Sequence, residues 1–428
     1  MPKKYVVISD LHFGDRGPLE DFVYEEEFIN FLDYLAGNSQ GKNSGVELVI
    51  NGDFIEFLQV PPLGGRDLNS GISKIKIVLS KHKKAFQKLG AFIAAGNQVR
   101  IIQGNHDIEL NFPEVRELMA DTIAGNDHEL KKGLIFHPTL SYMPPGVYIE
   151  HGNQYDSRNW VDHDHLIRDE VTKSLNLPWG SRFVIEIFNE VEARYGFIDN
   201  IKPLLAGAFI VLILDRNFFL DRVPRFLGLE VEDFFSLLKN ILRRDARSVE
   251  KQVQKAKLDR ESIKFIKDLA LVSGGLEQIH APPSQERRFL KEFWERTKLK
   301  ILQRTLPLIE STQRLWEVLH NDPNIETARN LIASKGVKWV VFGHTHGAKK
   351  VKTGNGTYLN TGTWTDLMVL PPSDEDQTLE AWLDSLKKPT TYPLVSKLSF
   401  VQIDYEKETP KGELMVWKEG KVMVDPGQ

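Results

Sequence analysis

The sequence predicts an α/β fold with a large helical insertion, and three observations support this prediction. Early in the chain, short runs rich in Val and Ile, typical of buried strands, alternate with longer segments whose apolar residues have helical spacing. Residues 159–321 carry successive helical stripes and few strand signals, and alternating runs return near the end of the chain. We therefore expect a core made of 1–158 and 322–428, with 159–321 as an inserted, mostly helical cap subdomain.

Five of the predicted strands end beside a residue that can bind a metal ion. These strands cover 5–9, 48–52, 99–103, 147–150 and 339–343. Ligands collect outside the carboxyl ends of the strands in an open α/β sheet, so we expect these side chains at one edge. The candidate ligands are Asp10, His12, Asp53, Asn105, His151, His344 and His346.

The remaining predicted elements follow from apolar spacing and turn residues. Segments 21–35 and 72–95 are predicted helices, and the lysines of the second, including Lys74, are expected on its solvated face. Runs at 134–137 and 147–150 indicate the start of a second sheet. Further predictions are helices at 231–242 and 249–271, a hairpin turned at Gly354-Asn-Gly356, and a closing hairpin formed by 398–405 and 412–417.

The candidate ligands indicate a pair of metal ions. Seven ligands exceed the roughly four to six that one ion takes, so two ions that share a carboxylate explain the set, with Asp53 as the natural bridge. Imidazole, carboxylate and amide ligands without thiolates suit two divalent transition-metal ions, Mn, Fe or Zn, and we favour Mn. A metal pair roughly 3.5–4 Å apart is suited to clamping the oxygens of a phosphoryl group during displacement.

Five short blocks of this sequence, all at strand ends, resemble the motifs of the calcineurin-like metallophosphoesterases. They are Asp10-x-His12, Gly52-Asp53, Gly104-Asn105-His106-Asp107, His151 and Gly343-His344-x-His346. The resemblance covers roughly residues 1–157 and 324–428. It implies a four-layer α/β/β/α sandwich and a binuclear hydrolase of phosphoester or pyrophosphate bonds.

The resemblance also implies how the ligands are shared between the two ions. Asp10, His12, Asp53 and His346 would hold one ion, and Asp53, Asn105, His151 and His344 would hold the other.

Four further residues are candidates for catalysis and substrate binding. If Asn105 binds metal, His106 lies beside the reacting phosphate, where it can protonate the leaving oxygen, and Asp107 is the candidate for orienting its ring. Arg16, in the loop after the first strand, is a candidate phosphate ligand, with an ordinary loop salt bridge as the alternative. Arg158 ends the polar segment 152–158, which is expected to contact substrate.

The substrate class is less well defined by the sequence. Asp10-Leu-His-Phe and Gly52-Asp-Phe-Ile-Glu are similar to the UDP-2,3-diacylglucosamine hydrolase branch, which cleaves a lipid-linked pyrophosphate at the membrane surface, although that branch commonly has Arg where this chain has His106. The apolar run 204–214 is too short to span a bilayer, so it is either a buried cap helix or a surface for acyl chains or for peripheral membrane contact. A phosphorylated small molecule, nucleotide or lipid is therefore the expected substrate. A nuclease or a protein phosphatase of the same family, and a non-catalytic binding scaffold, are the alternatives.

The composition limits the remaining function classes. Hydrophobic residues make up 41% of the chain, charged residues 27%, and the formal net charge is −4, so there is no strong nucleic-acid signal. Cysteine is absent, which excludes disulfides and a cysteine nucleophile. Only four apolar residues precede Ser9-Asp10, too few for a signal-peptide core, so cytoplasmic residence is expected.

Overall fold

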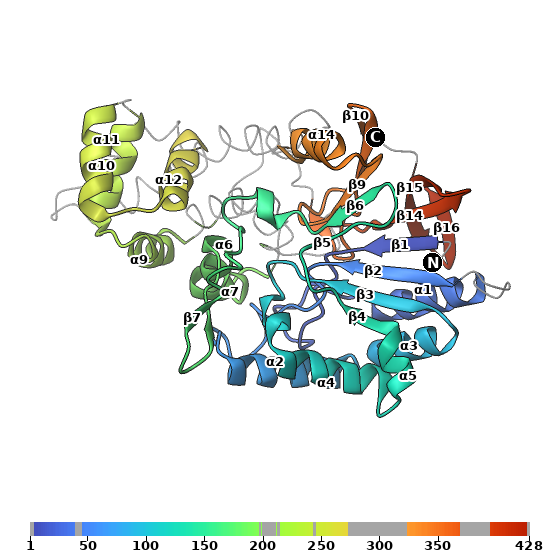
Figure 1. The fold of residues 1–428 in the computed structure, drawn as a ribbon. Helices are drawn as coiled ribbons and strands as arrows, with labels where there is room; N and C mark the ends of the chain where they lie inside the picture. Colours follow the sequence, from blue (N-terminus) through green and yellow to red (C-terminus); the bar gives the residue numbers. More distant parts are fainter. Residues whose placement is uncertain are drawn as a thin grey trace, which may run out of the picture. The chain divides into compact units, whose positions relative to one another are not determined.

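The computed structural model shows a mixed α/β protein, which confirms the predicted class (Figure 1). It describes residues 4–38, 45–196, 198, 211, 215–242, 245–272, 323–368 and 394–425. The chain divides into two compact units, which we call the core unit and the second unit. The core unit contains Met1–Ile185, Leu319–Asp366 and Ser396–Gln428, and the second unit contains Glu186–Val318 and Leu367–Val395.

A seven-stranded sheet with the order β16-β15-β14-β1-β2-β3-β4 forms the centre of the core unit. Its parallel strands are β1 (Lys4–Ile8), β2 (Val46–Asn51), β3 (Gln98–Ile102) and β4 (Leu134–Phe136). Its antiparallel extension is β14 (Leu398–Glu406), β15 (Thr409–Lys418) and β16 (Lys421–Val424), so the predicted closing hairpin is confirmed. In register, Ile8 pairs with Ile50, and Ile50 pairs with Ile101.

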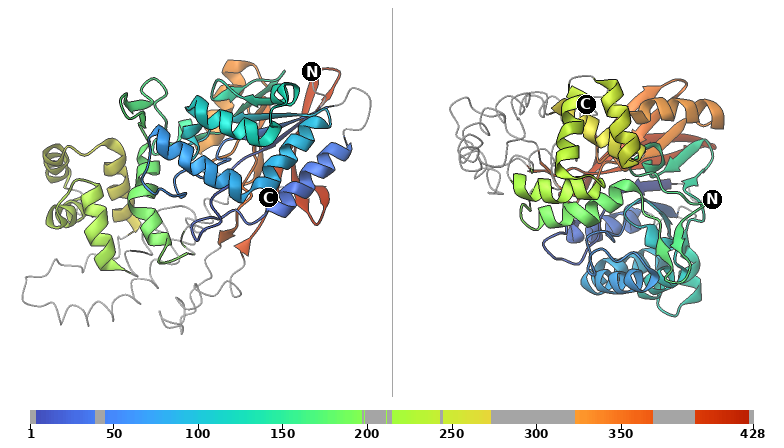
Figure 2. Two further views of the ribbon diagram at one scale, coloured as in Figure 1. Left: turned by 90° about the horizontal axis from the view of Figure 1, so that it is seen from below. Right: turned by 90° about the vertical axis from the view of Figure 1, so that its left-hand side faces the viewer.

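Helices cover one face of this sheet (Figures 1 and 2). They are α1 (Glu25–Asn38), α2 (Leu68–Lys81), α3 (Lys83–Ala94), α4 (Pro113–Ala124) and α5 (His128–Gly133), with the 3-10 turn η1 (Ile108–Asn111) before α4. Val6 and Ile50 of the sheet and Phe31, Phe86 and Val115 of the helices belong to one apolar cluster with other fully buried side chains. This cluster fixes where the carboxyl ends of β1, β2 and β3 lie.

The segment 72–95, predicted as a single helix, is two helices that meet at His82. His82 is buried, with φ −109° and ψ 27°, and its imidazole pairs with Glu20 at 2.8 Å and with Glu25 at 3.3 Å. Helical periodicity continues through this break, so only the tertiary ion pairs reveal it. The expectation for Lys74 was also wrong, because its side chain is fully buried, 4.0 Å from Glu109.

A second, five-stranded sheet has the order β10-β11-β9-β6-β5. Its strands are β5 (Ser141–Tyr142), β6 (Val147–Glu150), β9 (Trp339–Phe342), β10 (Lys349–Thr353) and β11 (Gly356–Asn360). The last two form the predicted hairpin. Of the two runs expected to begin a second sheet, 147–150 does so as β6, whereas 134–137 contains β4, which pairs with β3 in the first sheet, so that part of the prediction was wrong. The five strands that precede the candidate ligands therefore belong to two sheets, with β1, β2 and β3 in one and β6 and β9 in the other.

The two sheets share an apolar core. Val7 and Val49 of the first sheet cluster with Ile149, Val341 and Leu359 of the second. A separate cluster packs α14 (Pro323–Lys335) against β9 and β11 on the other face of the second sheet. A side-chain bond from Asn51 Nδ2 to the Glu150 carbonyl, 2.8 Å long, joins the carboxyl ends of β2 and β6.

Residues 152–185 of the core unit contain short elements that the sequence pattern did not indicate. They are the 3-10 turn η2 (Asn153–Tyr155), the hairpin β7 (Ile167–Asp169) and β8 (Ser174–Leu175), and α6 (Trp179–Phe183). The chain continues from α6 into a five-residue π-helical turn, η3 (Val184–Phe188).

The described part of the second unit consists mainly of helices. They are α7 (Asn189–Glu192), α9 (Arg216–Phe226), α10 (Val231–Leu242), α11 (Ala246–Ala256) and α12 (Arg260–Val272), with a two-stranded pair of β12 (Leu367–Met368) and β13 (Leu394–Val395). The prediction for 231–242 is confirmed by α10, whereas 249–271 is interrupted at Lys257, whose φ is 51°.

The apolar run 204–214 lies outside the described residues except for Val211, which is buried. Among the helices that the structure describes, none has both the length and the apolar character that crossing a bilayer requires.

Candidate metal centre

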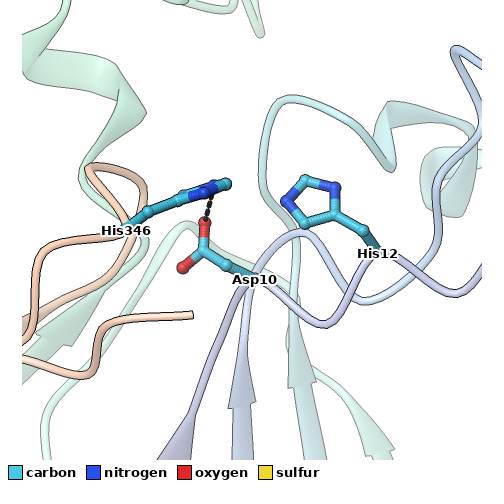
Figure 3. A group of neighbouring side chains, drawn as sticks. All are labelled: Asp10, His12 and His346. Atoms are coloured by element: carbon cyan, nitrogen blue, oxygen red, sulfur yellow. Dashed lines mark ion pairs between the residues drawn. The ribbon is translucent and has the colours of Figure 1, made fainter. Parts of the chain in front are cut away.

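The loop after β1 and the loop after β9 bring Asp10, His12 and His346 together (Figure 3). Each offers a ligand atom within 4.8 Å of the other two, and Asp10 Oδ1 lies 3.3 Å from His346 Nε2. The loop after β1 is held against the loop after β2 by backbone bonds from Asp10 N to Gly52 O, 3.1 Å, and from His12 N to Asp53 O, 3.0 Å. This cluster contains three of the ligands predicted for the first ion.

A second cluster contains Asp53, His151 and His344, whose ligand atoms also lie within 4.8 Å of one another. His151 Nε2 is 3.1 Å from Asp53 Oδ2, while its Nδ1 is 2.8 Å from the carbonyl oxygen of Asn51. Because a carbonyl can only accept a hydrogen bond, this contact places a proton on Nδ1 and directs Nε2 into the cluster. Asn105 is buried at the end of β3 and is the fourth ligand predicted here.

Most of these residues have a backbone conformation that side chains other than glycine seldom adopt. Positive φ values occur at five candidate ligands, namely Asp10 at 54°, His12 at 51°, Asp53 at 50°, His344 at 67° and His346 at 59°. Left-handed residues of this kind are uncommon, and several in one place are typical of functional sites, where the surrounding fold holds them.

Two glycines explain part of the sequence pattern around the ligands. Gly52 has φ 87°, and a Cβ there would collide with the imidazole of His151. A Cβ on Gly104 would collide with the carboxylate of Asp53. The glycines that precede Asp53 and Asn105 therefore make room for the second cluster.

Several ligand atoms are buried without a hydrogen-bond partner among the residues that the structure describes. They are Asp10 Oδ1, His12 Nε2, Asn105 Oδ1 and His151 Nε2, of which Asp10 Oδ1 and His151 Nε2 each have an ion-pair contact, with His346 and Asp53. A buried polar atom without a hydrogen bond costs about 1–3 kcal/mol, so His12 Nε2 and Asn105 Oδ1 need a compensating interaction. The donor set, two imidazole nitrogens with a carboxylate and an amide oxygen, fits a divalent transition metal.

The electrostatics of the clusters favour positive charge. Burial alone would raise the pKa of Asp10, but the imidazoles of His151 and His346 outweigh it and bring that pKa down to about 2. Burial opposes charge on His151 too, yet Asp53 and Asp10 raise its pKa to about 10. The carboxylates of Asp10 and Asp53 thus stabilise a positive charge on His151. They would stabilise a bound metal ion in the same way.

His106 lies at the edge of the first cluster, and Glu56 connects it to His12 of that cluster. Glu56 Oε2 is 2.7 Å from His106 Nδ1 and 2.8 Å from His12 Nδ1, and the two imidazole centroids are 4.7 Å apart. Burial would raise the pKa of Glu56, but His106 and His12 lower it to about 2, so a carboxylate orients both rings. The backbone N–H of His106 donates to Asp53 Oδ1 at 2.9 Å.

The position predicted for Asp107, as the group that orients His106, is taken by Glu56. Asp107 instead accepts backbone N–H bonds from Gly104, at 2.6 Å, and Phe54, at 2.8 Å. Burial and the nearby Asp53 raise the pKa of Asp107 to about 7. Its geometry is that of a residue that ties the β3 loop to the β2 loop.

The two predicted substrate contacts differ in their surroundings. Arg16 pairs with Glu25 and its side chain is 53% exposed, which corresponds to the loop salt bridge given as the alternative. Arg158 is half-buried in the loop after η2, where its backbone N–H donates to Asp156 Oδ1 at 3.0 Å. Asp156 Oδ2 in turn lies 3.2 Å from His344 Nε2.

Sequence reasoning overlooked Glu56 and Asp156 as site residues. Glu56 follows the ligand Asp53 by three positions, and Asp156 lies in a polar loop already expected near substrate, but neither spacing indicates a contact with a histidine from another strand.

No protein-family model matches this chain, and no curated protein matches it either.

Proposed function

We propose that this chain is a metal-dependent phosphoesterase of the calcineurin-like type, with a four-layer α/β/β/α core and a helical cap inserted between its halves. The observation that carries the proposal is the convergence of ligand atoms at the carboxyl ends of strands from two sheets, where His12 Nε2 and Asn105 Oδ1 are buried without a hydrogen-bond partner among the described residues. Five left-handed ligands support it independently.

Asp10, His12 and His346 would hold one divalent ion, and His151, His344 and Asn105 the other, with Asp53 shared. When bound, such a pair would polarise a phosphoryl oxygen and lower the pKa of a coordinated water. Manganese is our first choice because the set combines carboxylate and amide oxygens with imidazole and lacks thiolate.

The chain's own residues would supply the remaining chemistry. His106 extends from the same loop as Asn105 and has its Nδ1 fixed by Glu56 at 2.7 Å. A carboxylate on Nδ1 favours a proton there and leaves Nε2 as the nitrogen that exchanges a proton with the leaving oxygen. Asn51, Asp107 and Glu56 would keep the metal ligands and His106 in place as charge changes on the phosphate.

The test is metal-dependent hydrolysis by the purified full chain. The protein, stripped with chelator and reloaded with Mn, Zn or Fe, should bind about two ions per chain and cleave bis-p-nitrophenyl phosphate, whereas the stripped protein should not. As a matched pair, Asn105→Ala should lose activity, while Asn97→Ala, at another buried asparagine that bonds to Val46 N at 2.9 Å, should keep it. Stoichiometric metal binding without hydrolysis of any phosphoester would indicate a non-catalytic binding scaffold and would contradict the proposed enzymatic function.

The same assay separates the substrate classes. We propose a phosphoester or pyrophosphate substrate, nucleotide-like or lipid-linked, handled in the cytoplasm or at a membrane surface through the cap. Activity should therefore be compared on a nucleoside diphosphate ester, a lipid-linked pyrophosphate, single-stranded DNA and a phosphopeptide. Preference for either of the last two would identify a nuclease or a protein phosphatase.

A further inference from the structure

A cationic cavity of about 500 Å³ lies in the core unit, lined by groups that the proposed metal chemistry does not use. Three arginines line it, Arg66, Arg168 and Arg182, together with His165 and Asn176. Its other lining residues are apolar, and no acidic side chain is among the described residues that line it. Its volume is within the roughly 300–1,000 Å³ that is usual for small-molecule sites.

The walls of this cavity are joined by backbone bonds. Leu175 N of the β7–β8 hairpin donates to Arg66 O at 2.8 Å, and Asn176 N donates to Leu166 O at 2.7 Å. The buried Lys74 donates through Nζ to Gly65 O at 2.5 Å, which fixes the residue before Arg66. The cavity is therefore shaped by the fold of the core unit rather than by loose side chains.

The positive charge of the cavity is concentrated on its arginines. Within the described part of the chain, no acidic side chain pairs with the guanidinium of Arg66 or of Arg168, although Arg66 is half-buried. Of the other lining residues, His165 has an acidic neighbour, since Asp162 Oδ2 lies 3.0 Å from its Nδ1. Three guanidinium groups in one cavity, in a chain of net charge −4, select a compact anion, and their planar forks match phosphate oxygens.

The cavity is connected to the candidate metal centre through α6. Ser181, the neighbour of Arg182, is buried, and its hydroxyl donates to the carbonyl oxygen of Asn105 at 3.2 Å. Lys74, which fixes the Arg66 loop, lies 4.0 Å from Glu109, four residues after Asn105. The neighbour of Arg182 is thus bonded to Asn105 itself, and the residue before Arg66 is linked through Lys74 to Glu109 in the turn that follows.

We propose that this cavity binds a phosphate group, and that this group is a second phosphate of the molecule hydrolysed at the metal centre. The second half of the proposal rests on the proposed function. The chain would then prefer substrates with two separated phosphates over simple diesters. Arg66 and Arg182 would determine specificity without taking part in bond cleavage.

Phosphate binding tests the cavity without any hydrolysis. Titration of the chelator-treated full chain with inorganic phosphate, followed by calorimetry, should show binding that Arg66→Ala weakens by about tenfold or more, as expected for the loss of a charge-assisted contact. Arg168→Glu, on the exposed hairpin, should weaken it further without a change in thermal midpoint. Arg329→Ala is the control for net charge, because Arg329 lies on α14 and pairs with Glu326.

Kinetics then distinguish a second substrate phosphate from a separate phosphorylated ligand. In the metal-loaded protein, Arg66→Ala should raise KM for a nucleoside 3′,5′-bisphosphate about tenfold and leave bis-p-nitrophenyl phosphate unaffected. Absence of phosphate binding, or equal binding in Arg66→Ala, Arg168→Glu and Arg329→Ala, would overturn the cavity assignment. Arginine-dependent binding with an unchanged KM would overturn the link to the substrate. If no variant hydrolyses any substrate, the proposed function fails, and the titration alone still decides the cavity.

Discussion

Replacement of Glu56 by Gln is the sharpest test of how the candidate centre is organised. Glu56 is 2% exposed, and a single oxygen accepts from His12 Nδ1 and from His106 Nδ1. Gln keeps the shape but removes the charge. A charge-assisted hydrogen bond contributes about 1.5–3 kcal/mol and a neutral one about 1 kcal/mol, so weakening both bonds costs about 2 kcal/mol, or roughly 30-fold.

In Glu56→Gln, the weakened bond to His12 should lower metal affinity, and the weakened bond to His106 should lower kcat. Metal content after dialysis and kcat for bis-p-nitrophenyl phosphate at saturating metal measure the two effects separately. Glu47→Gln is the matched control, because Glu47 is 1% exposed on the same segment of chain and pairs with Arg100 away from the ligands. If Glu56→Gln retained wild-type metal affinity and kcat to within twofold, Glu56 would not orient these rings.

Three further predictions follow from single side chains. Asp53→Ala should abolish hydrolysis and bring the metal content below two per chain, and elemental analysis that still finds two tightly held ions would rule out Asp53 as the bridge. His106→Ala should lower kcat by about 10²–10⁴-fold with unchanged metal content; the loss should be smaller for p-nitrophenolate than for alkoxide leaving groups, and equal losses would exclude proton donation. Burial raises the pKa of Glu109 from 4.5 to about 7 despite Lys74, so the folded state retains a proton that the unfolded state releases. Stability should therefore fall by ~3 kcal/mol as the pH rises from 4.5 to 7, and urea unfolding of Glu109→Gln should lack that part of the pH dependence.

The sequence predicted the candidate metal centre best where a residue that can bind metal comes soon after a predicted strand. The candidate ligands directly follow strands, so the parallel order of β1, β2 and β3 places Asp10, Asp53 and Asn105 near one another once the strand ends are known. The position of His151 beside Asp53 depends on a second sheet, whose packing no local pattern encodes. Contacts between distant segments were therefore predicted only as far as the family resemblance implied them.

Glu56 and Lys74 show why the remainder could not be predicted. Glu56 acts on two histidines from different strand ends, and only the three-dimensional arrangement reveals this. Lys74 occupies a helical position that its charge alone would assign to solvent, but Glu109 and the Gly65 carbonyl hold it inside. The break at His82 has the same origin, since its cause is a pair of glutamates from another segment.

The division of the ligands between two sheets has a consequence for folding. Asp10 and His344 are 334 residues apart in the sequence, yet the N–H of His344 donates to Asp10 Oδ2 at 3.0 Å. Contacts between such distant residues form only after a large loss of chain entropy, so this centre should be completed late, when the sheets have already docked. Metal occupancy would then report complete assembly of the core, and an ion that binds the native state alone would protect the finished protein against unfolding by mass action.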